Sequence, residues 1–198
     1  MLLHEEGTME AALRRTVFEH DYRTVELEFR IGLHGKNDVG ETRWTKLRKF
    51  LGKETKKSVT VEKIARGNQS LARGTSSRYV EGLGSPHWNH KKRIHAEDDV
   101  RPPWRVRTAV ALEHVEPAPV PPSAWSIQRT KERYSYVVGA WTIDMTKVAT
   151  APPVDIDADH SYEVEIELTD HLEFFGKELR EILAAGRGIA DDMIARMK

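Results

Sequence analysis

The chain has 198 residues, of which 39% are hydrophobic and 31% are charged, so one sizeable core is possible but many charges must be placed around it. Its 31 basic residues equal its 31 acidic residues, which excludes a general attraction of the whole surface for nucleic acid or for an anionic membrane. It has no cysteine and no apolar segment long enough to span a membrane, which excludes disulfides and thiolate metal sites and leads us to expect a soluble, intracellular protein.

Two helices and four strands are expected in the first half of the chain. Residues 8–19 and 41–51 place apolar side chains at helical spacing, with Thr8 as the N-cap of the first helix and Gly52 closing the second. Residues 25–31 alternate strictly between apolar and polar side chains, as a half-buried strand does. Further strands are expected at 58–64, 78–81 and 88–97, with a loop over 66–77.

The second half of the chain is richer in strand patterns and ends in a helical segment. Strands are expected at 104–113, 127–138, 140–148 and 161–168. A proline-rich loop that begins at Pro117 follows the first of these strands, and Gly139 joins the second and third as a hairpin. After Thr169 the apolar side chains return to helical spacing. The eight strands and three helices predict a mainly β (α+β) fold in a single domain over residues 1–198.

Five of the predicted strands carry a row of charged or polar side chains on one face, opposite a mostly apolar face. Side chains at positions i and i+2 share a face and lie about 6.5–7 Å apart. The rows are Glu26-Glu28-Arg30, Arg105-Arg107-Glu113, Arg129-Lys131-Arg133, Thr142-Asp144-Thr146 and Glu163-Glu165-Glu167. On a single strand such a row is usually the solvated face. Five rows, one wholly acidic and one wholly basic, favour a closed antiparallel eight-stranded β-barrel whose charged faces line a tunnel, with a few flanking α-helices outside.

The charged rows suit one kind of chemistry. Carboxylates without histidine or cysteine are hard oxygen ligands, which select Mg²⁺ or Mn²⁺. Arginine recognises phosphate with a planar, bidentate fork, and lysine adds a point charge. Together these groups supply what phosphoryl transfer needs, because its catalysis is mainly positioning and charge neutralisation. The substrate that fits such a tunnel is an anionic polyphosphate.

The same strands resemble those of the triphosphate tunnel metalloenzymes, and more closely the RNA 5′-triphosphatases of the fungal and protozoan mRNA-capping type. Residues 25–30 are similar to the family's first metal-binding Glu-x-Glu, and residues 162–168 to its second, with three alternating glutamates. Residues 130–136 are similar to the Lys-x-Arg strand that grips the phosphates. Residues 107–113 resemble the strand whose Arg faces the substrate and whose Glu positions the attacking water. Asp144 and Thr146 fit a following Asp-x-Thr, but Thr142 stands where the capping enzymes usually carry Arg.

The resemblance implies a role for each group of residues. Glu26, Glu28 and Glu167 would be direct ligands of Mn²⁺ or Mg²⁺, and Glu165 would lie behind them or hold a second metal. The catalytic residues would be Arg107, Lys131 and Arg133, which hold the phosphates, and Glu113, which orients the water. The substrate-binding residues would be Arg78, Arg105, Arg129, Asp144, Thr146 and Glu163.

The function implied by the resemblance is metal-dependent removal of the γ-phosphate from triphosphate-ended RNA, the first step of mRNA capping, with hydrolysis of nucleoside triphosphates as well. The implied partners are triphosphate-ended RNA, nucleoside triphosphates and an RNA guanylyltransferase, with no membrane, in the nucleus or else the cytoplasm. Two alternatives stay open. One is another tunnel hydrolase, acting on thiamine triphosphate or inorganic tripolyphosphate, and the other is a non-catalytic barrel that binds polyphosphate or nucleic acid. The triple-glutamate last strand and the proline loop after Glu113 favour the capping enzyme.

Overall fold

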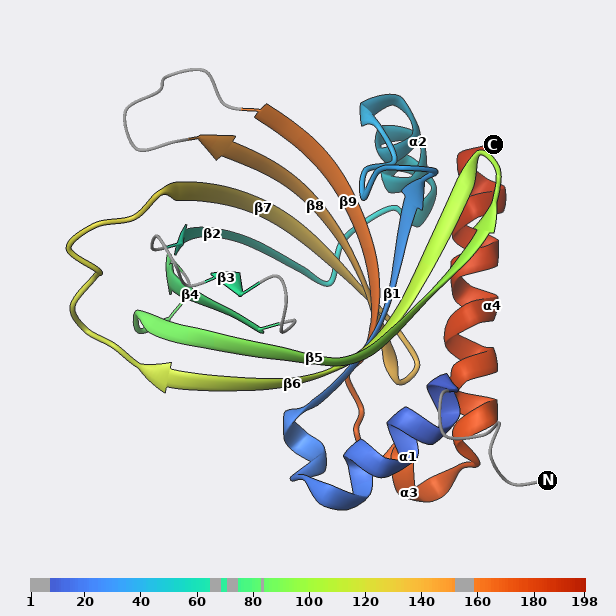
Figure 1. Ribbon diagram of the computed structural model, residues 1–198. Helices are drawn as coiled ribbons and strands as arrows, with labels where there is room; N and C mark the ends of the chain where they lie inside the picture. The colour runs from blue at the N-terminus through green and yellow to red at the C-terminus, as the bar shows by residue number, and fades with distance from the viewer. Residues whose placement is uncertain (1–7, 65–68, 71–74, 83, 152–158) are drawn as a thin grey trace.

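The computed structural model describes residues 8–64, 69–70, 75–82, 84–151 and 159–198, and these form a β-barrel with helices gathered at one side (Figure 1). The strands are β1 (Val25–Leu33), β2 (Lys56–Ile64), β3 (Gln69–Ser70), β4 (Thr75–Glu81), β5 (His87–Arg101), β6 (Trp104–Pro117), β7 (Ile127–Val138), β8 (Trp141–Ala151) and β9 (Asp159–Leu168). The helices are α1 (Met9–Glu19), the 3-10 turn η1 (Tyr22–Thr24), α2 (Glu41–Leu51), α3 (Glu173–Gly176) and α4 (Leu179–Met197).

The strands pair antiparallel in the order β2-β7-β8-β9-β1-β6-β5-β4, and β2 also pairs with β4, which closes the barrel. The two-residue strand β3 adds to the edge of β4. The predicted closed barrel of eight antiparallel strands is therefore confirmed. Closure leaves no long open edge and gives the eight strands a shared interior.

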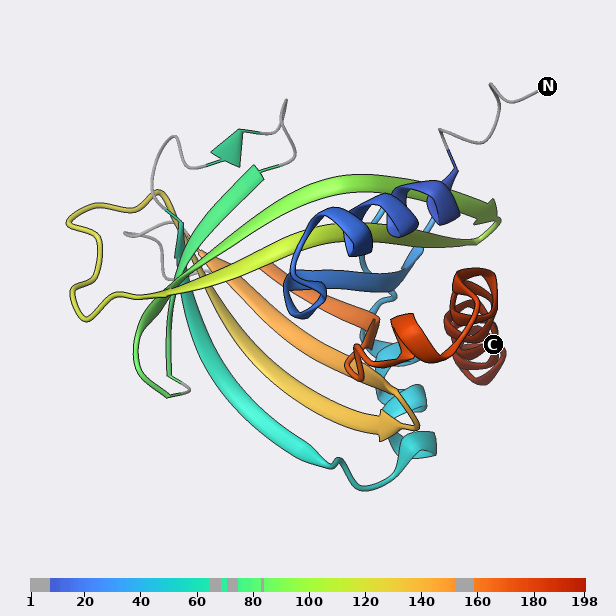
Figure 2. The same cartoon turned by 90° about the horizontal axis from the view of Figure 1, so that it is seen from below.

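The helices cover the apolar outer face of the barrel, as their sequence patterns predict. Figure 2 shows α1 lying along β5 and β6, while α4 packs against β1 and β9 and α2 packs against α4. Thr8 caps α1 by accepting a hydrogen bond from the Ala11 backbone N–H, and Gly52 ends α2 with a φ of 77°. Among the described residues no helix combines the length and the apolar character of a membrane span.

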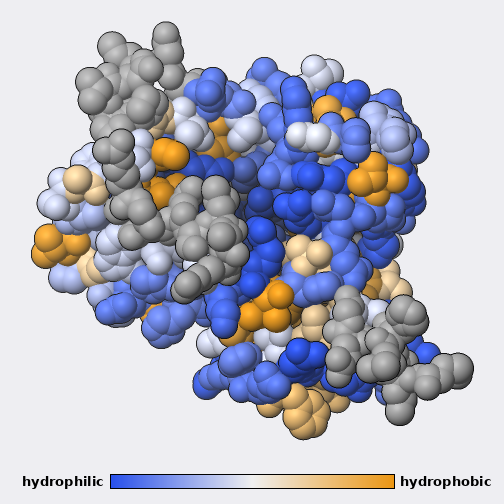
Figure 3. Space-filling view, in the orientation of Figure 1, coloured by the Kyte–Doolittle hydropathy of each residue, from blue (hydrophilic) through white to orange (hydrophobic). Residues whose placement is uncertain are grey.

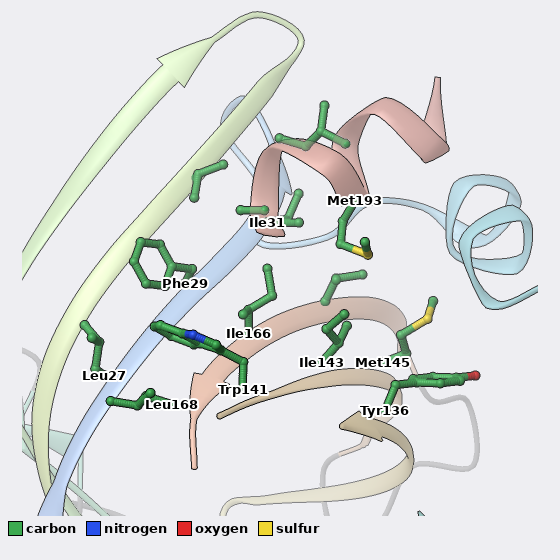
Figure 4. Packing of buried hydrophobic residues seen from close by; sticks show 14 of the residues in the cluster. Leu27, Phe29, Ile31, Tyr136, Trp141, Ile143, Met145, Ile166, Leu168 and Met193 are labelled. Carbon is green, nitrogen blue, oxygen red and sulfur yellow. The ribbon is translucent and has the colours of Figure 1, made fainter. Parts of the chain in front are cut away.

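The hydrophobic core lies between these helices and the outer faces of β1, β8 and β9 (Figure 4). Phe29 of β1, Ile143 of β8 and Ile166 of β9 are each at most 2% exposed. Their neighbours along each strand point the other way, into the barrel, because strand side chains alternate between faces. Trp44, Trp104 and Trp141 also belong to this core.

Seven of the eight predicted strands differ from the structure in their bounds, and the differences that matter most are those of β4, β5 and β6. Residues 75–77, expected in a loop, belong to β4, and the rest of that loop over 66–77 lies outside the described residues apart from β3. Strand β5 spans residues 87–101 rather than 88–97, and β6 continues past residue 113 to Pro117. These two strands form one long hairpin with an irregularity between Arg93 and His95, so their hydrophobic alternation is interrupted.

Candidate active site

Charged side chains from seven strands line one cavity of about 320 Å³ inside the barrel. Eight of the fourteen residues that the sequence singled out line this cavity: Glu26, Glu28, Arg78, Glu113, Lys131, Arg133, Glu165 and Glu167. The four predicted metal ligands are among them. On the face of the molecule in Figure 3, hydrophilic residues predominate and apolar ones form scattered groups.

The acidic wall of the cavity is formed where the first and last strands pair. In the antiparallel register of β1 and β9, Glu28 lies opposite Glu167, and Arg30 lies opposite Glu165. Glu26 and Glu28 are 8% and 6% exposed. The pairing brings together carboxylates that lie far apart in the sequence, as the hypothesis of a shared metal requires.

Two cations within the acidic wall neutralise part of its charge. Lys91 of β5 places its Nζ 2.6 Å from Glu26 Oε1 and 3.0 Å from Glu28 Oε2. Arg30 forms an ion pair with Glu165 and lies 3.8 Å from Glu28 Oε1. Neither cation was given a role from the sequence, although Arg30 stands in the first charged row.

Burial makes the carboxylates of this wall unlike one another. Burial raises the pKa of Glu26 to about 9, although Lys91 opposes the rise. The pKa of Glu28 is lowered overall. Burial acts to raise it, but the positive charges of Lys91 and Arg30 outweigh the effect of burial. Burial, with Glu113 and other nearby carboxylates, raises the pKa of Glu167 to about 7. Ionising all of these carboxylates at once is therefore unfavourable, and binding a cation between them would be favourable.

Glu165 behaves differently because basic groups surround it. Burial would raise its pKa, but Arg30, Arg133 and other cations outweigh that effect and leave the pKa lowered. Glu165 is therefore ionised at neutral pH and links the acidic wall to the basic one.

The cations of the basic wall are each paired with a carboxylate, and Glu62 serves three of them. The carboxylate of Glu62 on β2 forms an ion pair with Lys131 at 2.7 Å. The guanidinium groups of Arg78 and Arg129 each lie 3.6 Å from the same carboxylate. Burial lowers the pKa of Lys131, although Glu62 opposes the fall. Arg133 lies 3.0 Å from Asp144 and 4.0 Å from Glu165. Acidic partners thus fix the positions of the cations that face the cavity.

Glu113 lies in the same cavity and is oriented by a neighbour. Asn89 of β5 donates a hydrogen bond from Nδ2 to Glu113 Oε1 over 2.7 Å. The carboxylate of Glu113 keeps a second oxygen, which can accept a hydrogen bond from a water molecule.

The structure places Arg105 and Arg107 outside the lining of this cavity. Arg107 donates from Nε and Nη2 to Asp98 over 2.9 and 2.8 Å, and Arg105 donates to the Lys36 carbonyl over 3.1 Å. Their side chains follow the parity of Glu113, as predicted. However, positions 107 and 113 are six residues apart, which corresponds to about 20 Å along a strand. Alternation predicts the face of the sheet, but not the depth along the tunnel.

Four further predicted residues support the lining rather than form it. Arg129 donates to Glu163 Oε1 over 2.8 Å. Asp144 accepts a hydrogen bond from Ser135 Oγ at 2.5 Å besides its pair with Arg133, and Thr146 is fully buried. Their roles as substrate contacts stay predictions.

Sequence reasoning assigned no role to four residues that line the cavity, Arg30, Glu62, Asn89 and Lys91. Glu62 had a signal, because Ser58, Thr60 and Glu62 form a polar row on β2 opposite Val59 and Val61. Asn89 and Lys91 had none, because β5 is polar on both faces over this stretch.

A divalent cation fits the acidic wall, although Lys91 occupies part of it. Among the residues that the structure describes, no cluster of three or more carboxylate or imidazole groups is arranged as a ready metal site. However, Glu26 Oε2 is buried without a hydrogen-bond partner within the described part of the chain. Oxygen donors alone, several of them carboxylates, are the ligand set that Mg²⁺ and Mn²⁺ prefer.

Known proteins resemble this chain in both sequence and fold. The family described as "mRNA capping enzyme, beta chain" matches residues 103–181. A 5′-RNA triphosphatase of Paramecium bursaria Chlorella virus 1 is 37% identical over 182 residues, which cover 88% of this chain and 91% of that protein.

Two solved structures share the fold at lower identity. The S. pombe RNA triphosphatase Pct1 matches with a TM-score of 0.63 and 16% identity, over 87% of this chain and 84% of that one. The triphosphatase domain of a trifunctional mimivirus mRNA capping enzyme matches with a TM-score of 0.60 and 10% identity, over 95% of this chain and 94% of that one. The barrel and its helices are therefore an arrangement that these structures have in common.

Proposed function

The chain belongs to the family of RNA 5′-triphosphatases, and on that premise we propose that its barrel removes the γ-phosphate from triphosphate-ended RNA, as the first step of mRNA capping. One observation carries the proposal. One cavity inside the closed barrel sets the carboxylates of β1 and β9 against the cations of β7, with Arg78 of β4 beside them. Opposed walls of this kind suit a polyphosphate that is neutralised from both sides.

Glu26, Glu28 and Glu167 are the residues we assign to Mn²⁺ or Mg²⁺, with Glu165 supporting them through its ion pairs with Arg30 and Arg133. The support for this assignment is the register of β1 and β9, the unpartnered Glu26 oxygen and the raised pKa of Glu167. A bound divalent cation would neutralise phosphate charge and polarise the reacting phosphorus centre.

The basic wall binds the phosphates in this proposal. Lys131 and Arg78 now share Glu62, and Arg133 is paired with Asp144, so each cation is held in place before substrate arrives. A fixed cation loses little freedom when a phosphate oxygen binds, and it acts in a site of low dielectric. These residues therefore orient the triphosphate and stabilise the charge that develops on the γ-phosphoryl group.

Glu113 is assigned to the attacking water. Asn89 fixes one carboxylate oxygen, which leaves the other to accept a proton from the water as it attacks the γ-phosphorus. The bond from the γ-phosphorus to the bridging oxygen breaks, and the products are inorganic phosphate and a diphosphate-ended RNA. The proton taken by Glu113 then returns to solvent.

The size of the cavity favours recognition of the chain end alone. About 320 Å³ is enough for a triphosphate group but not for an RNA helix. The equal numbers of acidic and basic residues give no support to a long electrostatic footprint on RNA. Nucleoside triphosphates carry the same triphosphate, so we expect them to be hydrolysed too.

A phosphate-release assay tests the proposal. The purified protein is given RNA labelled at the γ-phosphate, and then ATP, tripolyphosphate or thiamine triphosphate, with Mn²⁺, Mg²⁺ or a chelator. We expect metal-dependent release from RNA that leaves a diphosphate end, and a loss of at least about 100-fold in Glu28→Gln. Full release in chelator would refute the metal assignment, and a preference for thiamine triphosphate over RNA would refute the substrate.

The position in capping implies a partner and a location. A diphosphate end is the acceptor for guanylate transfer, so an RNA guanylyltransferase is the expected partner, and the nucleus, or else the cytoplasm, is the expected location. The S. pombe Pct1 enzyme has been solved in complex with the Spt5 CTD, so a relative of this fold does bind another protein. Co-purification and imaging of the tagged protein would test both expectations.

A further inference from the structure

Lys91 supplies a positive charge to the part of the acidic wall formed by Glu26 and Glu28. Its side chain is 16% exposed, and the side chains of Glu26 and Glu28 that it contacts are 9% and 7% exposed. The path of this side chain is open because β6 presents Ala111 and Ala109 opposite Glu26 and Glu28. A larger residue at either alanine would stand between β5 and β1.

Two carboxylates buried this closely repel each other, and leaving them without a cation would cost the folded state several interactions at once. A single ammonium group meets both of them, at 2.6 and 3.0 Å. Lysine suits a contact that must be broken later, because its charge sits on a flexible stem and makes no fixed bidentate fork. The absence of a ready three-carboxylate metal cluster among the described residues agrees with this occupancy.

We propose that Lys91 is a built-in counter-cation of the metal site: its ammonium group pairs with Glu26 and Glu28 in the metal-free protein, and a divalent cation displaces it on binding. The inference rests on the metal assignment in the proposed function. It has two consequences. The barrel folds and persists without metal, and the metal binds less tightly than its carboxylates alone would allow, because it competes with an internal cation.

The test measures stability and metal binding without substrate. Lys91→Met keeps a similar length but removes the charge, and Lys92→Met is the matched control, because Lys92 is exposed and points away from the cavity. In chelator at pH 8, we expect the melting temperature of Lys91→Met to fall by about 10 °C, and that of Lys92→Met to stay within about 2 °C of wild type. Titration with Mn²⁺, followed by the electron paramagnetic resonance of free Mn²⁺, should give a Kd about tenfold lower for Lys91→Met.

A second variant separates charge from packing. Adding Glu28→Gln to Lys91→Met removes the carboxylate that stays ionised beside the lost ammonium group, so the metal-free double variant should melt close to wild type. If the double variant is as unstable as Lys91→Met, or too unstable to purify, Lys91 acts through packing and the inference is wrong.

Metal titration distinguishes this inference from the proposed function. If wild type binds Mn²⁺ and Lys91→Met binds it no more tightly, the counter-cation role is refuted while the metal site stands. If wild type binds no Mn²⁺ at millimolar concentration, the metal assignment fails and the inference fails with it.

Discussion

Lys131 is unusually buried for a lysine. It is 6% exposed, and its ion pair with Glu62 stabilises its charged form. Burial lowers the pKa of Lys131, so the side chain loses its proton at a lower pH than a free lysine would. The neutral amine no longer attracts phosphate. As the pH rises, the free enzyme should therefore lose affinity for its substrate at a pH below about 10.4, the ordinary pKa of lysine.

The first prediction follows from that shift. The pH profile of kcat/KM should fall on the alkaline side in wild type, and Lys131→Arg should move this fall to higher pH, since arginine stays charged throughout. The measurement is kcat/KM for an RNA triphosphate between about pH 7 and 10. Lys57→Arg is the control, because Lys57 pairs with Glu132 on the outer face of the same strand pair. An alkaline fall that is identical in Lys131→Arg would exclude Lys131 as its source.

The second prediction compares two arginines that the sequence places on the same inward face but that lie at different depths along the tunnel. Arg133 lines the cavity, whereas Arg107 is paired with Asp98 away from it. We expect Arg133→Ala to lower kcat/KM by about 100-fold or more, since it removes a charge that faces the reacting phosphate. Arg107→Ala should lower it by less than about fivefold, as surface substitutions remote from the chemistry usually do. Comparable losses in the two variants would mean that the substrate extends to the Asp98 end of the tunnel.

At the scale of elements, the strands that were easiest to predict are those covered by helices. Strands β1, β8 and β9 bury their outer faces under α4 and α2, so they alternate cleanly between apolar and charged residues. Strand β5 has no such cover over its first half, and Trp88, His90 and Lys92 alternate there with other polar residues. The sequence therefore singled out the four carboxylates of the acidic wall and the cations of the basic wall, but it missed Glu62 and the residues that β5 contributes.

Helix α4 packs closely enough on the barrel to require glycine at one position. A Cβ at Gly186 would stand 2.6 Å from Trp141 Cη2 and closer still to Phe29, whereas a Cβ at Gly188 would meet nothing within 4 Å. Both glycines lie inside the same helix, where alanine is preferred by about 1 kcal/mol. Packing and propensity therefore oppose each other at one site only.

The third prediction compares the two glycines directly. Gly188→Ala should stabilise the protein by up to about 1 kcal/mol, through helix propensity alone. Gly186→Ala should destabilise it by up to about 2 kcal/mol, because the overpacking cost of about 1–3 kcal/mol outweighs the gain in propensity of about 1 kcal/mol. Thermal melting of both variants in the same buffer checks the signs. Equal stabilisation by both would mean that α4 can shift away from the barrel without cost.

At the scale of the whole molecule, the barrel closes through its shortest pairing. Strand β2 pairs with β7 along its full length, but with β4 only from Val61 to Lys63. Ion pairs reinforce this seam, one between Lys63 and Glu81 at 2.5 Å and one between Glu62 and Arg78 at 3.6 Å. A seam with so few backbone hydrogen bonds is where the barrel should open first.

The fourth prediction concerns how a polyphosphate affects this seam. Arg78 lies on β4 and Lys131 on β7, so a phosphate chain that contacts both joins the two sides. Without ligand, amides of β4 and of the facing end of β2 should exchange with solvent faster than those of β8, which is paired along both edges. Saturating tripolyphosphate should slow exchange in β4 by about tenfold or more and leave β8 nearly unchanged, since only the seam gains a new link.

Hydrogen exchange followed by mass spectrometry measures both regions in one sample, and Arg78→Ala removes the link on one side as the control. If tripolyphosphate protects β4 no more than β8, or protects it equally in Arg78→Ala, the ligand does not bridge the seam, and Arg78 has no part in holding the phosphates.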